Sequence, residues 1–315
     1  MPTTMTEKET MKAVQIHAFG GPEVLQYEDA PQPQPNANEI LVRVHAVGVN
    51  PVDWKIREGY LSATLPMIMG IDFSGVVESV GNEIKKYRPG DAVFGQVTDE
   101  SGSYAEYTLT MESYIARKPD GLDHSRTAAL PVAGLVAWQA LFDTANLTAG
   151  RKVLIHAASG GVGSFAVQFA KWKGARVIGT ASGAHVEQVR QFGADEVIDY
   201  RRTKFEEVAR DVDVVLDTIG GETQERSWQV LKPGGVLVSL VQPPAAEKAA
   251  ALGARGFFVS QKANSEQLAA IADLVVKGTV KVNIETVLPL SEARKAQELS
   301  KTGHSGGKIV LEVNR

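Results

Sequence analysis

The stretch that most constrains the fold is an apolar run that enters a glycine-rich turn, residues 153–164, VLIHAASGGVGS. The run predicts a buried strand, and the apolar positions within residues 164–173 predict the helix that follows. Glycine lets the backbone bend tightly and approach a pyrophosphate, while the N–H groups and dipole of the next helix stabilise the phosphate charge. We therefore expect a dinucleotide-binding turn.

The spaced pattern GxGxxG is imperfect here, because alanine occupies its first position. The residues expected to contact a cofactor in this turn are Ala158, Gly160, Gly161, Val162 and Gly163. An ordinary strand-to-helix turn is the structural alternative. The phosphate loop of nucleoside triphosphatases does not fit, because its Gly-Lys-Ser/Thr ending is missing. The turn therefore favours an oxidoreductase.

The chain changes character at about residue 131. Before it, short apolar segments between turn residues predict strands at 12–17, 40–49, 75–80, 92–95 and 104–109. After it, strands are predicted at 153–156, 175–180, 196–199, 212–217 and 236–241, with helices between them. This alternation predicts an α/β fold with a parallel, doubly wound sheet. The remaining expectations are a loose tail at 1–10, a helix at 267–276 and a β-like tail at 281–313.

Composition narrows the function. The 315 residues suggest about two domains. The absence of cysteine excludes disulfides, thiolate nucleophiles and cysteine-ligated zinc, and it is compatible with the cytoplasmic location that we expect. A net charge of -4 offers no attraction to nucleic acid. No apolar run approaches the roughly 18 residues of a membrane span.

Six blocks of sequence, in a fixed order, carry a family resemblance. They are GVNPVDWK at 48–55, GIDFSGVV at 70–77, GDAV at 90–93, GSYAEY at 102–107, LPVAG at 130–134 and SGGKIVL at 305–311. With the glycine turn, they resemble the zinc-free medium-chain dehydrogenase/reductases, in the quinone oxidoreductase and alkenal/enone reductase branch. The resemblance covers nearly the whole chain after Met11.

The resemblance implies two domains with a nicotinamide-binding cleft between them. A GroES-like, partly open β-barrel would comprise residues 11–130 and 283–315, and a Rossmann domain of residues 131–282 would be inserted into it. The resemblance also implies a homodimer, often formed by edge strands of the Rossmann sheets. The candidate edges are residues 236–240 and 256–259.

No metal is expected. Zinc-dependent relatives have a cysteine ligand where this chain has Asn50 and a histidine ligand where it has Ile71. The six histidines show no metal-ligand spacing. His156, at the end of the first Rossmann strand, either contacts the cofactor or only packs in the core.

The cofactor expected is NADPH. NAD sites usually have Asp or Glu at the end of the second strand, but this chain has GTASGAH at 179–185, which suits a 2′-phosphate. Thr180 and Ser182 lie in that segment, and the resemblance places Ser182 and Tyr200 beside the phosphate. His185 stands near the position of a family lysine, so Arg201 or Arg202 would supply the missing charge. A solvated surface turn is the alternative for residues 200–202.

The nicotinamide half is expected beyond the carboxyl ends of the later strands. Ile219, Leu240 and Val241 would border it there, although plain core packing explains such residues equally well. Val136 replaces a threonine that the family often has, and a hydroxyl contact to the nicotinamide would be lost. In the tail loop, Ser305 and Gly306 are further cofactor candidates, with Gly306 in place of a residue that is often basic.

The catalytic candidates are Asn50, Lys55 and Tyr60. The resemblance places Asn50 beside the nicotinamide ribose and Lys55 near the cofactor and the substrate oxygen. Lys55 has a structural alternative, a weak surface ion pair with Asp53, which we expect to act as a helix-turn acceptor. Tyr60, with Leu61 and Trp54, would line the acceptor pocket, and either Tyr60 or water would give the final proton.

We therefore expect a metal-free, NADPH-dependent reductase of quinones or α,β-unsaturated carbonyls. Conjugation in such acceptors delocalises the negative charge that arrives with the hydride, so Lewis-acid assistance is less important. The alternative is a non-catalytic NADPH-binding sensor or scaffold. Neither reading involves nucleic acid or a membrane.

Overall fold

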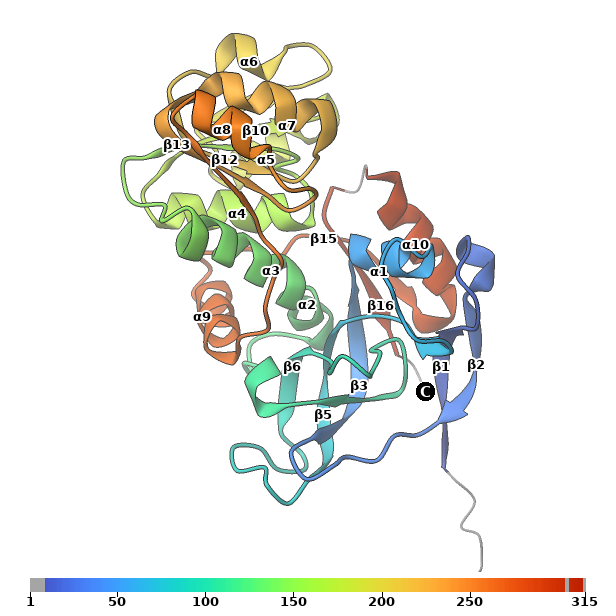
Figure 1. The fold of residues 1–315 in the computed structure, drawn as a ribbon. Coiled ribbons are helices and arrows are strands. Elements are labelled where there is room, and N and C mark those ends of the chain that lie inside the picture. The colour runs from blue at the N-terminus through green and yellow to red at the C-terminus, as the bar shows by residue number, and fades with distance from the viewer. Residues whose placement is uncertain (1–8, 304–305, 314–315) are drawn as a thin grey trace, which may run out of the picture.

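The computed structural model describes residues 9–303 and 306–313. A six-stranded parallel sheet forms one lobe (Figure 1), in the order β11-β10-β9-β12-β13-β14. Its strands are β9 Lys152–Ile155, β10 Arg176–Ala181, β11 Glu196–Asp199, β12 Val212–Asp217, β13 Leu231–Ser239 and β14 Arg255–Phe258. This order is the one that dinucleotide-binding doubly wound sheets have, so the predicted parallel sheet is confirmed.

Helices cover both faces of this sheet. They are α3 Pro131–Trp138, α4 Gly161–Trp172, α5 Val186–Gln191, α6 Phe205–Val208, α7 Gly221–Ser227, α8 Ala246–Ala251 and α9 Ser265–Val276. Along β9 the side chains alternate between two separate clusters. Val153 and Ile155 pack with α3, α4 and α9, while Leu154 packs with Phe205 and Trp228. A strand that is buried on both faces has no polar alternation, which explains its continuous apolar run.

The other lobe is antiparallel for the most part. A seven-stranded sheet has the order β15-β16-β3-β5-β6-β8, with β7 also on β3, and a smaller sheet has the order β2-β1-β4. The strands are β1 Thr10–Ile16, β2 Gln26–Pro31, β3 Ile40–Val49, β4 Met67–Ile68, β5 Asp72–Val80, β6 Ala92–Gln96, β7 Tyr107–Thr110, β8 Ile115–Arg117, β15 Ile284–Pro289 and β16 Lys308–Glu312. Its helices are α1 Pro51–Arg57, α2 His124–Ala128 and α10 Ala293–Thr302.

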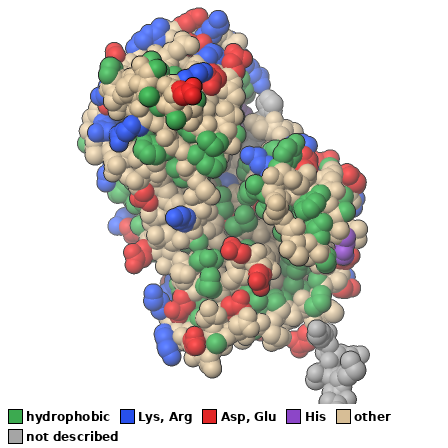
Figure 2. Space-filling model, viewed as in Figure 1, with side chains coloured by type: hydrophobic (Ala, Val, Ile, Leu, Met, Phe, Trp, Pro, Cys, Tyr) green, Lys and Arg blue, Asp and Glu red, His purple; other side chains and the backbone are tan. Residues whose placement is uncertain are grey.

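The C-terminal strand returns to the N-terminal lobe. β16 runs antiparallel beside β3, with Ile309 opposite Val49 and Leu311 opposite Val47. The return brings Lys308 next to the start of α1, although about 260 residues separate them in the chain. Figure 2 shows the two lobes with a hollow between them, partly lined by hydrophobic side chains.

Two details differ from the sequence prediction. The expected β-like tail contains α10, in which Ala293, Ala296 and Gln297 form the narrow buried stripe of an otherwise polar helix. Residues 236–240 are no sheet edge, because β13 lies between β12 and β14. The other candidate edge, residues 256–259, is confirmed, because it coincides with the edge strand β14. In the part of the chain that is described, no helix is long and apolar enough to cross a membrane.

Candidate active site

A pocket with a volume of about 340 Å³ lies at the carboxyl ends of β9, β10, β11 and β12. Six residues predicted from the sequence line it: Gly160, Thr180, Ser182, His185, Tyr200 and Ile219. The pocket therefore collects residues from the glycine turn, from the end of β10 and from the loop after β11, where the adenosine half of a dinucleotide is held in such sheets.

The glycine turn depends on close backbone contacts. Ala157 has a φ of 46°, in the left-handed region. A Cβ atom on Gly163 would lie 2.2 Å from the carbonyl oxygen of Ala157 and 2.8 Å from the Cα of Ala158. Only glycine therefore fits at residue 163 without moving the turn. Gly161 and Val162 form the first turn of α4, where N–H groups have no helical partner.

His156 both packs and lines the pocket. Its side chain is 1% exposed, with Nδ1 3.2 Å from Thr180 Oγ1 and Nε2 2.9 Å from Ser227 Oγ. Burial lowers the pKa of His156 to about 4, so the ring is neutral at physiological pH. His156 therefore adds shape and hydrogen bonds to the pocket but no charge.

Asp217 organises the wall formed by β12 and α7. One carboxylate oxygen accepts the backbone N–H groups of Ile219 and Gly220, at 3.0 and 2.8 Å. The other accepts Gln224 Nε2 at 3.0 Å and Ser239 Oγ at 2.8 Å. The side chain is fully buried, and the donors of Ile219, Gly220 and Ser239 depend on it, whereas Gln224 Nε2 also donates to the carbonyl oxygen of Gln242 at 3.2 Å.

Two cations line the pocket that the sequence did not single out, Lys204 and Arg226. Arg226 forms ion pairs with Glu206 at 3.1 Å and with Glu222 at 3.5 Å. Arg201 and Arg202, the predicted cations, are not among the lining residues. Arg202 pairs with Asp199 at 3.5 Å, and the Arg201 guanidinium lies 6.0 Å from the Tyr200 ring centroid.

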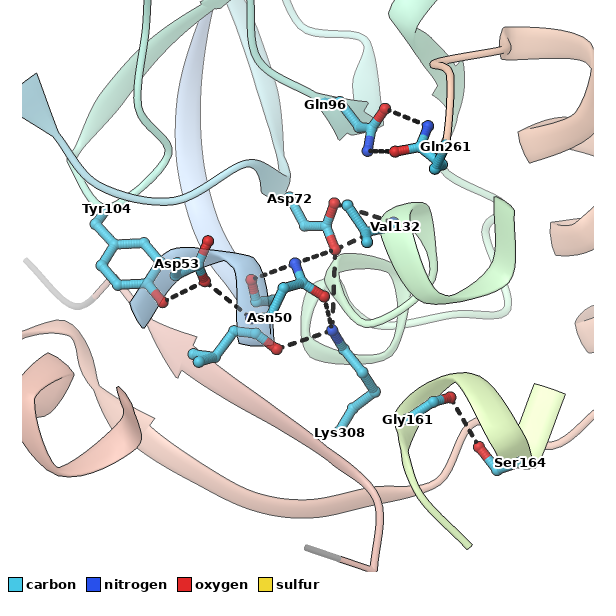
Figure 3. A network of polar contacts seen from close by, with 12 residues as sticks. Asn50, Asp53, Asp72, Gln96, Tyr104, Val132, Gly161, Ser164, Gln261 and Lys308 are labelled. Atoms are coloured by element: carbon cyan, nitrogen blue, oxygen red, sulfur yellow. Dashed lines mark hydrogen bonds and ion pairs between the residues drawn. The ribbon is translucent and has the colours of Figure 1, made fainter. Parts of the chain in front are cut away.

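A second cluster of polar residues lies at the junction of the two lobes (Figure 3). Asn50 is 2% exposed and donates through Nδ2 to Asp72 Oδ2 at 2.9 Å. Lys308 Nζ donates to Asn50 Oδ1 at 2.6 Å and to the carbonyl oxygen of Val49 at 2.9 Å. Asn50 therefore has the buried polar surroundings of a functional residue, and Lys308 is a group that sequence reasoning missed.

Asp53 supports the same cluster from α1. Its Oδ2 accepts the backbone N–H of Asn50 at 2.8 Å and the hydroxyl of Tyr104 at 2.9 Å. Asp53 is completely buried, and burial raises its pKa to about 7. The predicted structural alternative for Lys55, an ion pair with Asp53, is not formed, because Asp53 faces the interior.

Lys55 and Tyr60 lie apart from this cluster. Lys55 Nζ is 5.7 Å from the Trp54 ring centroid, and Tyr60 is 71% exposed with its ring 6.2 Å from that of Trp54. Among the described contacts, neither side chain bonds to Asn50 or Lys308. Their assignment as catalytic residues stays a prediction.

The remaining predicted cofactor residues are dispersed. Val136 is buried on α3, Leu240 packs against the core, and Val241 is 37% exposed. The carbonyl oxygen of Gly306 accepts Gln188 Nε2 at 3.0 Å, which joins the tail loop to α5. Ser305 lies outside the described residues.

Two family models match the chain. Residues 36–120 match the alcohol dehydrogenase GroES-like domain, and residues 192–311 match the zinc-binding dehydrogenase model. The residues here do not fit zinc, however. At residue 50 an amide replaces the cysteine ligand, and its oxygen already accepts the Lys308 ammonium, whose charge opposes a metal ion.

The chain is similar to whole proteins as well as to domains. It is 35% identical to quinone oxidoreductase from Pseudomonas aeruginosa, over 95% of this chain and 99% of that protein. It is 34% identical to the NADPH-dependent alkenal/one oxidoreductase, chloroplastic, of Arabidopsis thaliana, over 96% of this chain and 79% of that protein.

Solved structures with a similar fold include the same class of enzyme. The quinone oxidoreductase from Coxiella burnetii has a TM-score of 0.92 and 36% identity, over 97% of this chain and all of that chain. Escherichia coli quinone oxidoreductase complexed with NADPH has a TM-score of 0.89 and 29% identity, over 96% of this chain and 100% of that chain. These matches and the site confirm the expected pairing of a GroES-like domain with a Rossmann-like sheet. The chain belongs to the medium-chain dehydrogenase/reductase superfamily, in the quinone oxidoreductase and alkenal reductase branch.

Proposed function

We propose that this protein is an NADPH-dependent oxidoreductase that transfers a hydride to quinones or to α,β-unsaturated carbonyls. The observation that carries the proposal is the pocket at the glycine turn, which combines hydroxyl groups with cations and has no carboxylate at the end of β10. The relatives named as quinone and alkenal/one oxidoreductases support the reaction class. No observation favours the non-catalytic sensor.

The preference for NADPH rests on Lys204. This exposed lysine lines the pocket together with Ser182 and Tyr200, and among the described contacts its ammonium makes no hydrogen bond or close ion pair, although its charge acts on Glu206. Arg226, in contrast, is held by two glutamates. An unpaired ammonium beside hydroxyl donors is the arrangement that a phosphate needs. We assign to Lys204 the contact with the 2′-phosphate that Arg201 or Arg202 was expected to make.

We expect Lys204→Met to lower the ratio of kcat/KM for NADPH to kcat/KM for NADH by about 10- to 100-fold, the value of one charge-assisted hydrogen bond. Steady-state rates with both cofactors measure it. Lys277→Met, which removes an exposed lysine at the end of α9, is the matched control and should leave the ratio unchanged. An unchanged ratio in the Lys204 variant would assign the phosphate contact to another cation.

The reduced nicotinamide, when bound, supplies the hydride. The chain's own residues hold the nicotinamide half and shape the acceptor site: we place Asn50 against the ribose, at the junction where Lys308 and Asp72 fix its side chain. The acceptor takes up one hydride and one proton. For an enone the hydride forms a new C–H bond at the β-carbon, and the proton, from water, reaches the α-carbon.

Isotope transfer tests this reaction. NADPH carrying deuterium at both C4 positions is incubated with the protein and a short alkenal, and the product is examined by mass spectrometry and NMR. We expect one deuterium at the β-carbon of the saturated aldehyde. Cofactor oxidation with no deuterium in the product would contradict hydride transfer to the alkene.

Two expectations from the sequence stay predictions. The homodimer is supported by β14, an edge strand on which Phe257 and Phe258 are 37% and 49% exposed. The cytoplasmic location rests on composition alone.

A further inference from the structure

Lys308 is a lysine buried inside the protein; burial lowers its pKa, and the carboxylates of Asp72 and Asp53 oppose that shift and favour the ammonium. Its side chain is 3% exposed, and its Nζ lies 2.9 Å from the carbonyl oxygen of Val49, 2.6 Å from Asn50 Oδ1 and 3.9 Å from Asp72 Oδ2. Figure 3 shows the lysine pointing into this group of oxygen atoms. Burying an ammonium is costly unless such partners surround it, so the cluster is built around this charge.

The cluster gives the Asn50 amide a single orientation. Its nitrogen donates to Asp72 and to the carbonyl oxygen of Gly48, and its oxygen accepts from Lys308. Rotating the amide by half a turn would set its oxygen against a carboxylate and its N–H₂ group against an ammonium. Lys308 and Asp72 therefore exclude the flipped amide from opposite sides.

The lysine stem also contacts the glycine turn. A Cβ atom on Gly161 would lie 3.0 Å from Lys308 Cδ, so residue 161 has little room for a side chain there. Gly161 begins α4 in one lobe, whereas Lys308 begins β16 in the other. The same side chain thus lies beside the glycine turn that we expect to bind the pyrophosphate, and it holds the residue that we place at the nicotinamide ribose.

Asp72 extends the cluster to α3. Its two oxygens lie 3.1 and 3.2 Å from the backbone nitrogen of Val132, in the first turn of that helix. Burial raises the pKa of Asp72 to about 6, and the Lys308 ammonium is the largest opposing influence. The other ionisable group acting on the cluster is Asp53 on α1, with Tyr104 bonded to it, while Asn50 and Gln96 are neutral.

We propose that Lys308 is a positioning residue of the reaction: its ammonium fixes the Asn50 amide and the ionised Asp72 carboxylate. The binding site for the nicotinamide half is thereby held in one arrangement. The inference rests on the proposed function, because it assumes that the nicotinamide lies against Asn50. This chain would then have the ammonium of Lys308 beside residue 50, the position at which zinc-dependent relatives are expected to have a metal ligand.

The test compares Lys308→Met with Lys308→Arg, using Lys277→Met as the control. We expect kcat/KM for the acceptor to fall at least about tenfold in Lys308→Met and to recover most of its value in Lys308→Arg. Affinity for 2′-AMP, which has no 5′-phosphate and so reports only the adenosine side, should stay unchanged. Wild-type turnover is measured first, so its absence would refute the proposed function and not this inference.

The pH profile separates positioning from mere packing. An ionised Asp72 is required, so activity is lost as the pH falls through the pKa of Asp72, near 6, whereas a step near pH 7 would belong to Asp53. Without the ammonium the pKa of Asp72 rises. The low-pH decline in the activity of Lys308→Met, the acid limb of its pH profile, should therefore shift to higher pH by about one unit or more. Asp72→Asn, which is neutral like the protonated acid, should be slow at every pH and should therefore lack this decline. A Lys308→Met enzyme with the wild-type rate and limb would overturn the proposal. If that variant does not fold, a wild-type limb in Asp72→Asn would do so.

Discussion

Gly163→Ala should destabilise the protein by at least about 2 kcal/mol and weaken NADPH binding by tenfold or more, although alanine normally favours a helix. Alanine destabilises the helix start here, contrary to its usual effect, because the new Cβ atom would lie 2.2 Å from the carbonyl oxygen of Ala157. Backbone, not a flexible side chain, is in the way, so the turn itself must move. Chemical denaturation and fluorescence titration with NADPH measure the two effects.

Gly121→Ala is the matched control. A Cβ atom at residue 121 would meet no heavy atom within 4 Å, and the residue lies in an exposed loop. We expect its free energy of unfolding to stay within about 0.5 kcal/mol of the wild type. Equal stability and equal NADPH affinity for Gly163→Ala and the wild type would contradict the turn geometry.

Asp217→Ala should cost at least about 3 kcal/mol in the free energy of unfolding and should also weaken cofactor binding. Removing this carboxylate leaves the N–H groups of Ile219 and Gly220 and the hydroxyl of Ser239 without their acceptor, while Gln224 keeps its bond to the carbonyl oxygen of Gln242. Ile219 lines the pocket, so the damage reaches the site. Denaturation and calorimetric NADPH titration check both consequences.

Asp273→Ala provides the comparison for this loss. Asp273 is an exposed residue of α9 whose ion pair with Lys277 joins side chains 55% and 64% exposed. Such surface pairs contribute little, so we expect a change below about 1 kcal/mol. If the two aspartate variants lost similar stability, Asp217 would not be the organising acceptor that its contacts indicate.

The parallel sheet was predictable because its signals are local. Strands buried on both faces read as unbroken apolar runs, as in Val153 to Ile155, and a glycine turn follows at the point where α4 begins. Several residues around the pocket at the glycine turn were predictable for the same reason. They follow the ends of β9, β10 and β11, and the carboxyl ends of parallel strands meet at one edge.

The junction cluster was not predictable from local patterns. Lys308 reaches Asn50 only because β16 pairs with β3, and a contact between residues 258 positions apart leaves no periodic trace. Lys204 was missed for a related reason. Its sequence neighbours predict a surface turn, and only the packing of Phe205 against the sheet brings the lysine to the pocket. α10 was missed because its buried stripe is mostly alanine.

The most direct test of the central claim is NADPH oxidation, followed at 340 nm, by chelator-treated protein supplied separately with a quinone and a short alkenal. NADH serves as the comparison cofactor. We expect turnover with at least one of the two acceptors and faster turnover with NADPH than with NADH. Tight binding of NADPH without its consumption by either acceptor would contradict the reductase and favour a cofactor-binding protein.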